Sequence, residues 1–283
     1  MSRKFSAATA CGLAFVLLSS AAHAEDVAAF YHGRQIEVDV GFGAGGGYGL
    51  YTQVLARHLS RFMPGNPAIT IKYVPGAGGI KALNFVYNVA PRDGTVFAIS
   101  GETLPMYQII RPKGMKADLS QVGWIGRLGR MTNVFMVRNN APATTVDGAR
   151  KVQVILAANG KGDQTYMYPD LMNKLLGTKF KMVLGYPGSR EMDVAMERGE
   201  AQGRGGAWAS WKAVRQDWID SKFVLPLVQI GLEHEQDLAG VPLLYELATK
   251  DDDRAILRLV SSSAAVGRAY FTPPGVAAEW LAA

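Results

Sequence analysis

A run of glycines between a strand and a helix is the feature that most constrains how this chain folds. The run covers residues 41–49, with the sequence GFGAGGGYG. It follows the strand-like segment 34–40 and precedes the helix-like segment 50–59. Residues without side chains let backbone N–H groups approach a ligand, and a helix N-terminus favours negative charge. The pattern therefore predicts an anion-binding turn within an α/β fold.

The N-terminus predicts export from the cytoplasm. Arg3 and Lys4 precede the apolar run 12–18, and the small-residue site Ala22-His23-Ala24 follows. That order is typical of a secretory signal peptide, residues 1–24, cleaved after Ala24, and the apolar run is too short to span a membrane. The single cysteine, Cys11, lies before the apolar run, so the order does not fit a lipoprotein anchor. We therefore expect a periplasmic protein with no disulfide.

Size and charge narrow the class of partner. The chain has 283 residues and a formal charge of +6, which falls to +4 when Arg3 and Lys4 are removed with the signal peptide. The basic residues are scattered among acidic ones, without the basic stripe that is typical of nucleic-acid-binding proteins. We expect no nucleic-acid partner. A mild positive excess suits a small anionic ligand.

Strand-like and helix-like segments alternate along most of the mature chain, which predicts parallel sheets in an α/β architecture. Further strands are expected at 68–74, 95–100, 133–137, 152–158, 180–184 and 223–230, and further helices at 80–89, 166–176 and 189–198. Pro226 inside the last strand favours an edge or crossover position. Crossing segments near 130–137 and 223–231 divide the chain into lobe I (25–132 plus 232–283) and lobe II (133–231).

Two nucleotide-binding interpretations of the glycine run are excluded. Gly41, Gly43 and Gly46 match G-x-G-x-x-G, but a dinucleotide site also needs an acidic residue at the end of the second strand. That strand ends at Val74 and runs into Pro75, without the acidic residue. A phosphate-binding P-loop would need Gly-Lys-Ser/Thr, which does not follow. No cofactor is expected.

A second glycine turn, residues 75–79, follows the next strand. Successive βα turns of a parallel sheet lie at the same edge, so both turns are predicted to present N–H groups to one anion. The alternative is that the glycines only form tight turns. Lobe II has similar turns at 160–165, 185–190 and 203–208. Thr165 and Ser189 there are either helix N-caps or ligand contacts.

Catalytic and metal-binding patterns are scarce. The histidines of the mature chain, His32, His58 and His234, lack the spacing of a metal site. No Gly-x-Ser-x-Gly nucleophile motif occurs. Asp163 and Glu191 lie near glycine turns but form no paired-carboxylate pattern. The sequence therefore predicts neither catalytic residues nor a metal site.

An ordered set of motifs resembles the substrate-binding receptors of tripartite tricarboxylate transporters, the TctC or Bug family. The set comprises residues 40–47, Asn66-Pro67, 74–79, 87–95, 185–188, 195–200, 240–244 and 272–275. The resemblance implies a two-lobed type II periplasmic-binding-protein fold, in which each lobe is a mostly parallel sheet flanked by helices. It also implies a non-catalytic receptor that binds a small carboxylate through backbone amides and ordered waters in the interlobe cleft. The implied partners are the permease subunits of the membrane transporter, and we expect a monomer.

The glycine turns of both lobes supply the expected ligand-binding residues. These are Phe42, Gly43, Ala44, Gly45, Gly46, Gly47, Tyr48, Gly76, Ala77, Gly78, Gly79, Gly162, Asp163, Gln164, Thr165, Tyr186, Gly188, Ser189 and Arg204.

This chain departs from the family pattern at three places. Gly49 stands where relatives commonly carry an aspartate that contacts ligand amino groups, which favours a purely anionic acid. Thr52-Gln53 replaces a common Ala-Arg pair. Family chains usually continue past the segment that ends here at Ala283, so we expect the last packing element of lobe I to be missing.

Two other functions stay open, a secreted α/β enzyme acting on a small carboxylate or ester and a ligand sensor for a membrane signalling partner. The sequence does not identify the ligand.

Overall fold

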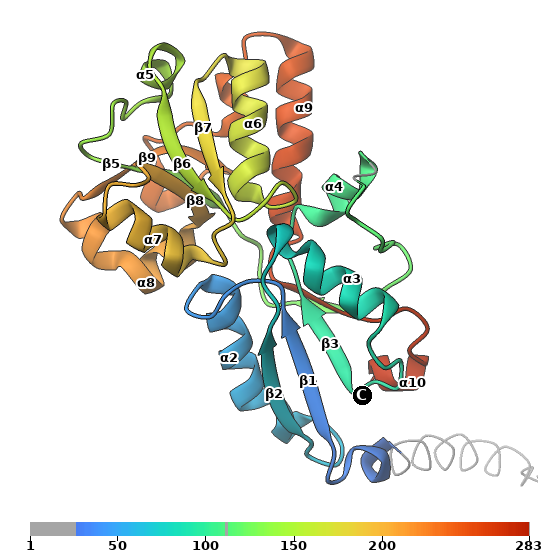
Figure 1. The fold of residues 1–283 in the computed structure, drawn as a ribbon. Helices are drawn as coiled ribbons and strands as arrows, with labels where there is room; N and C mark the ends of the chain where they lie inside the picture. The colour runs from blue at the N-terminus through green and yellow to red at the C-terminus, as the bar shows by residue number, and fades with distance from the viewer. Residues whose placement is uncertain (1–26, 111–112, 283) are drawn as a thin grey trace, which may run out of the picture.

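The computed structural model describes residues 27–110 and 113–282. The expected signal peptide, residues 1–24, lies outside the described residues. Two lobes, each built on one five-stranded sheet with helices on its faces, lie one above the other in Figure 1. Within residues 27–110 and 113–282, no helix has the length and apolar character needed to cross a membrane.

The sheet of lobe I has the strand order β2-β1-β3-β10-β4. Strand β1 pairs in parallel with β2 and β3, whereas β10 is antiparallel to both β3 and β4. The strands are β1 (Gln35–Val40), β2 (Ala68–Tyr73), β3 (Val96–Ile99), β4 (Gly123–Arg127) and β10 (Ala269–Thr272). The helices are α2 (Gly47–Leu59), α3 (Ile80–Asn88), α4 (Leu104–Ile109) and α10 (Ala278–Ala282).

Apolar side chains cover both faces of this sheet. Ile36, Val38 and Val40 of β1 are fully buried in the cluster that also includes Tyr48 of α2. Leu83 of α3 lies in the cluster of the opposite face. A parallel sheet needs this double cover because neither of its faces is solvated. The carboxyl end of β1 is thereby held rigidly, and the glycine run begins there.

The sheet of lobe II repeats this arrangement with the order β7-β6-β8-β5-β9. Strand β6 is parallel to β7 and β8, and β5 is antiparallel to β8 and β9. The strands are β5 (Asn133–Arg138), β6 (Val154–Ala158), β7 (Phe180–Leu184), β8 (Gly203–Ala207) and β9 (Val224–Ile230). The edge position of β9 confirms what Pro226 indicated, and the pairing register shifts beside that proline.

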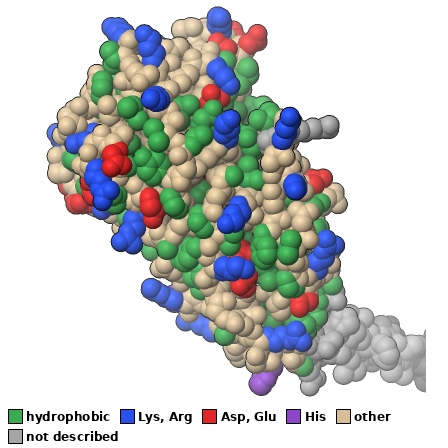
Figure 2. Space-filling model, viewed as in Figure 1, with side chains coloured by type: hydrophobic (Ala, Val, Ile, Leu, Met, Phe, Trp, Pro, Cys, Tyr) green, Lys and Arg blue, Asp and Glu red, His purple; other side chains and the backbone are tan. Residues whose placement is uncertain are grey.

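Four longer helices cover the faces of the second sheet. Helices α6 (Gln164–Leu176) and α9 (Asp251–Ser261) pack on one face, and α7 (Ser189–Glu197) and α8 (Trp208–Asp220) pack on the other. The short helix α5 (Val146–Lys151) joins the α6 side. Trp208, Trp211 and Trp218 supply most of the bulk between α8 and the sheet. On the face of the molecule in Figure 2, lysines and arginines are dispersed among acidic and apolar side chains.

The packing of α9 differs from the predicted division into lobes. Residues 232–283 were expected in lobe I, but Leu257 and Val260 of α9 lie in the core of lobe II together with Leu244. Figure 1 shows α9 beside α6. The chain therefore returns to lobe I after α9, before β10. The sequence could not predict this packing, because the apolar face of α9 does not show which of the two sheets it covers.

The predicted turn at 203–208 is wrong. Residues 203–207 form strand β8, and Trp208 begins α8. Glycine is needed in this strand because large neighbours crowd it: a Cβ on Gly205 would lie 2.7 Å from the ring of Phe135. Strands β4 and β10 were not predicted.

Candidate ligand-binding site

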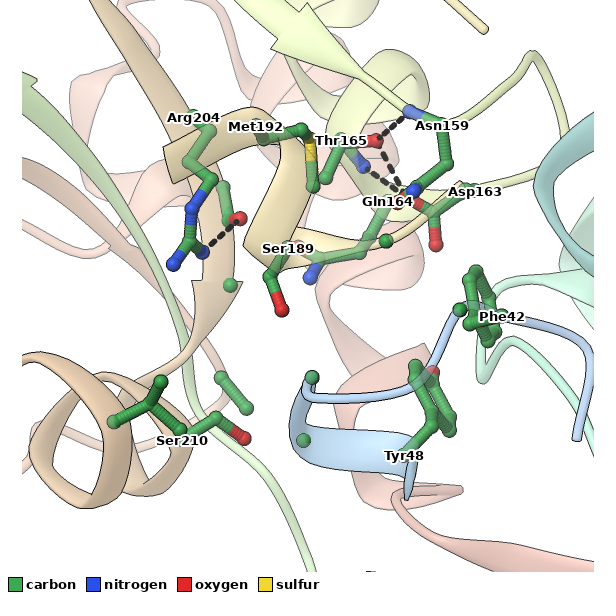
Figure 3. A pocket seen from close by; sticks show the side chains of 18 of the residues that line it. Phe42, Tyr48, Asn159, Asp163, Gln164, Thr165, Ser189, Met192, Arg204 and Ser210 are labelled. Atoms are coloured by element: carbon green, nitrogen blue, oxygen red, sulfur yellow. Dashed lines mark hydrogen bonds between the residues drawn. The ribbon is translucent and has the colours of Figure 1, made fainter. Parts of the chain in front are cut away.

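A cavity of about 40 Å³ lies between the two lobes. Its lining comprises Phe42, Gly43, Gly46, Gly47, Tyr48 and Arg268 from lobe I, and Asn159, Asp163, Gln164, Thr165, Gly188, Ser189, Met192, Arg204, Gly205, Gly206, Ala207, Ser210 and Val214 from lobe II. Figure 3 shows Tyr48 and Phe42 facing this space from one side and Ser189 and Arg204 from the other. The cavity has room for about three water molecules, so a larger ligand needs the lobes to move apart.

Two helix N-termini, one from each lobe, face this cavity. Gly46 is the N-cap of α2 and Gly188 is the N-cap of α7. Neither residue has a side chain to accept hydrogen bonds from the first-turn N–H groups. The interpretation of Ser189 as an N-cap is therefore wrong, because it is the first helical residue. Uncapped N–H groups and the positive ends of two helix dipoles make this space favourable for an anion.

Arg204 is a cavity-lining cation held by a carboxylate behind it. It is 4% exposed, its Nε donates to Asp193 Oδ1 at 2.5 Å, and its guanidinium lies over the ring of Trp211. Asp193 also accepts from Arg215 Nε at 2.9 Å. Burial lowers the pKa of Arg204, and Asp193 opposes that effect. Two arginines share this buried carboxylate, and Arg215 also pairs with Glu197 at 3.7 Å, so Arg204 is fixed in place at the cavity by a balanced network of charges.

Asp163 places an acid in the same cavity. It is the N-cap of α6 and accepts from the backbone N–H and the hydroxyl of Thr165, which corrects the interpretation of Thr165 as the N-cap. The pKa of Asp163 is raised to about 6, mainly by burial and less by nearby Glu102, against the opposing effect of the hydrogen bonds from Thr165. Its charge therefore changes close to neutral pH.

Direct contacts hold the lobes together around the cavity. Gly43 N donates to Pro187 O at 2.9 Å, and Thr103 Oγ1 donates to Gly162 O at 2.7 Å. A Cβ on Gly78 would lie 2.8 Å from the backbone N of Asp163. The lobes are thus in a closed arrangement, with their glycine turns in contact.

A larger hollow of about 350 Å³ lies on lobe I, away from the cleft. Among the described residues its lining is mostly apolar, including Leu55, Phe62 and Ile125, with Arg127 as the one charged side chain. It lacks the converging N–H groups and buried cations of the interlobe cavity. The interlobe cavity is therefore the better candidate for an anion site despite its smaller volume.

Comparison with known proteins identifies the fold. No protein-family model and no curated protein matches the sequence. Among solved structures, the periplasmic binding protein BugD matches at 16% identity with a TM-score of 0.68, over 88% of this chain and 79% of its own. MatC from Rhodopseudomonas palustris with bound malate matches at 18% identity and a TM-score of 0.71, over 88% of this chain and 81% of its own. The R. palustris protein Rpa4515 with adipate matches at 20% identity with a TM-score of 0.66, over 88% of this chain and 80% of its own.

This chain has the fold of a periplasmic binding protein. The two-lobed α/β architecture expected from the resemblance to the TctC or Bug receptors is confirmed at the level of the fold. The interlobe position of the cavity suits that periplasmic-binding-protein fold, because α/β folds bind ligands beyond the carboxyl ends of their parallel strands.

The structure brings many of the predicted ligand-binding residues to the cavity of this periplasmic-binding-protein fold. Those that line it are Phe42, Gly43, Gly46, Gly47, Tyr48, Asp163, Gln164, Thr165, Gly188, Ser189 and Arg204. The others lie outside its lining: Ala44, Gly45, Gly76, Ala77, Gly78, Gly79, Gly162 and Tyr186. The second glycine turn, 76–79, instead packs against the loop before α6 in the other lobe.

Several lining residues carried no recognised sequence signal. Asn159 follows β6 directly, so the rule that located the glycine turns at strand ends also points to it. Gly206 and Ala207 lie in the segment 203–208 that the sequence marked as a glycine turn but were not chosen as ligand contacts, and Ser210 lies just beyond it in α8. Arg268 had no signal, since it lies more than 200 positions from the first glycine turn and in no motif.

Proposed function

We propose that this chain is a periplasmic solute-binding receptor of the TctC or Bug type that captures a small carboxylate between its lobes. One observation carries the proposal. The N-termini of α2 and α7, one from each lobe and both with a glycine N-cap, flank a cavity that the buried arginines Arg204 and Arg268 also line. Helix N-termini and guanidinium groups are the groups that proteins use to bind carboxylates. The malate and adipate in two structural neighbours support the same ligand class.

The proposed ligand-binding residues are the predicted ones that line the cavity. Their backbone N–H groups at residues 46–48 and 188–189 hold the ligand from opposite lobes. Ligand entry requires the lobes to separate, and closure then brings Gly43 against Pro187 and Thr103 against Gly162. The receptor acts by binding and release rather than by catalysis.

The wider proposal concerns where the receptor works and what it delivers to. Residues 1–24 serve as a cleaved signal peptide, the mature chain works as a monomer in the periplasm, and the ligand passes to the membrane subunits of a tripartite permease. Cell fractionation tests the compartment. Uptake of a labelled ligand by cells with and without the permease subunits separates transport from a sensing role.

A thermal-shift screen tests the binding function. The panel comprises succinate, malate, adipate, citrate, benzoate and glutamate. A ligand at a hundredfold excess over its dissociation constant stabilises the folded state by about 2.7 kcal/mol. We expect at least one acid to raise the melting temperature, with titration calorimetry confirming a single site. No shift with any acid at millimolar concentration, in protein shown to be folded, would contradict the proposal.

A further inference from the structure

Arg268 lies in the cleft, yet nothing in the glycine-turn pattern accounts for it. It directly precedes β10, is 3% exposed and lines the interlobe cavity. Its guanidinium carbon lies 3.7 Å from the ring centroid of Tyr48, beside the N-terminus of α2. Its Nη2 reaches Ser210 Oγ of lobe II at 3.4 Å. The side chain is thus anchored in lobe I and spans the cleft.

The acid that pairs with Arg268 is Glu102, whose carboxylate also accepts hydrogen bonds from other side chains. Glu102 Oε2 lies 3.5 Å from Arg268 Nη1, but that oxygen accepts from the hydroxyl of Tyr48 at 2.5 Å. The other oxygen of Glu102 accepts from Asn133 Nδ2 at 2.7 Å. Burial and Glu102 raise the pKa of Tyr48 well above its ordinary value, so its hydroxyl stays protonated and keeps donating to Glu102.

Arg268 therefore keeps hydrogen-bonding capacity that Arg204 has used. Arg204 is bound tightly by Asp193, whereas Nε and Nη1 of Arg268 are buried and find no hydrogen-bond partner within the part of the chain that the structure describes. A guanidinium has five donors, and leaving buried donors of a charged group unpaired is costly. Arg268 is thus paired in charge with Glu102 but keeps buried N–H groups that have no acceptor among the described residues.

We propose that Arg268 binds the ligand directly, its guanidinium pairing with a carboxylate of the bound acid while Tyr48 and Glu102 fix its position. This inference rests on the proposed carboxylate-binding function and adds a specific side chain to it. A guanidinium matches a carboxylate with two parallel N–H bonds, which a lysine ammonium cannot reproduce. Recognition by backbone amides and waters alone does not require such a residue. Arg268 makes binding select for an ionised carboxylate at this end of the cleft.

The test compares three variants with the wild type by titration calorimetry, using each acid of the thermal-shift panel that the wild type binds. Arg268→Gln removes the charge, and Arg268→Lys keeps it but loses the paired geometry. Arg258→Gln is the matched control, because Arg258 is exposed on α9, outside the cavity. We expect Arg268→Gln to weaken binding by about 30-fold or more. Arg268→Lys should weaken it by about tenfold, and the control should leave it unchanged.

A second measurement separates ligand contact from a structural role. The affinity of the wild type should fall with added salt more steeply than that of Arg268→Gln, because the variant has lost one charged contact. Thermal melting of the ligand-free proteins checks that each variant is folded. If Arg268→Gln does not fold, the affinity of Arg268→Lys decides between ligand contact and a structural role. Affinities of the folded Arg268 variants within twofold of wild type would overturn this inference and leave the receptor function intact. Failure of the wild type to bind any acid would overturn both.

Discussion

The two glycine turns of lobe I look alike in sequence but differ in backbone conformation and in what they contact. In the first, residues 41–49, Gly45 has a positive φ of 85°, whereas Gly46 has an ordinary extended backbone. In the second, all four residues from 76 to 79 have positive φ, including Ala77. The first turn lines the cavity, and the second packs on the opposite lobe.

The difference lies in why glycine is required. In the first turn the space for a Cβ is already taken: one on Gly46 would lie 2.6 Å from Ser189 Oγ, and one on Gly47 would overlap Ser210. In the second turn the backbone itself adopts a left-handed path that other residues resist. Glycine therefore serves close approach in the first turn, whereas the second turn needs it for backbone conformation and, at Gly78, also for close approach to Asp163. We infer that the first turn binds the ligand and that the second shapes the closing contact.

The largest expected effect comes from filling the first turn. Gly47→Val introduces branched carbons where Ser210 and Arg268 lie, so it blocks both closure and the first-turn N–H groups of α2. We expect affinity for the bound acid to fall more than about 100-fold, a loss above about 2.7 kcal/mol. Calorimetry measures it, and Gly240→Ala serves as the control because a Cβ at Gly240 meets nothing within 4 Å. Wild-type affinity in Gly47→Val would show that the first turn is not the binding element.

Two alanine variants, one in each glycine turn, compare the turns by their effect on the free energy of unfolding. Gly78 has a φ of 69°, so backbone strain in Gly78→Ala should lower the free energy of unfolding by about 1–2 kcal/mol, and the close approach to Asp163 adds to this loss in the closed form. Gly46→Ala imposes no such strain, because φ there is −98°. Chemical denaturation without ligand measures both. The account is contradicted if Gly46→Ala is the less stable of the two.

Asp163, which lines the cavity and lies against the second turn, should make the ligand affinity depend on pH. Its pKa is raised to about 6, so the carboxyl is neutral below that pH and charged above it. Each acid of the panel keeps at least one ionised carboxylate at pH 5.5, so lowering the pH from 7.5 should strengthen binding of that carboxylate beside Asp163, by up to about tenfold per unit of pKa shift between the free and bound states. Asp163→Asn keeps an N-cap for α6 and should flatten this dependence. Affinity that weakens on acidification would contradict the sign.

The smallest effect is expected at the closing contact. Thr103→Val removes the buried hydrogen bond from Thr103 Oγ1 to Gly162 O and keeps the side-chain shape. The closed form should lose about 1 kcal/mol, which corresponds to about fivefold weaker ligand binding. Open protein lacks this contact, so the ligand-free stability should change less than the affinity. Equal losses in both would mean that the contact also holds in the ligand-free state.

Much of the fold was predictable because buried parallel strands read as continuous apolar runs. Strand β6 fits this description. Strand β1 instead alternates apolar and polar residues, and β7 is a short segment at the sheet edge with mostly exposed residues. Strand β4 was missed because its residues are glycine-rich and mostly exposed, and β10 has only four residues. The glycines of β8 were mistaken for a turn, since nothing local reveals that Phe135 lies across them.

The site was predictable where it depends on local backbone geometry. The first glycine turn and the N-terminus of α7 were found because a strand end, glycines and a helix start are adjacent in sequence. Arg268 was missed because its place beside Tyr48 depends on the pairing of β10 with β3. The second turn was assigned to the ligand because its left-handed backbone cannot be distinguished from an anion-binding conformation by composition.

A crystal structure of the mature protein with the acid that gives the largest thermal shift tests the central claim most directly. We predict a carboxylate bound between the N–H groups of residues 46–48 and those of residues 188–189, with the 76–79 turn on the opposite lobe and free of ligand contact. Density for the acid only outside the interlobe cavity, or held chiefly by the second turn, would contradict the account.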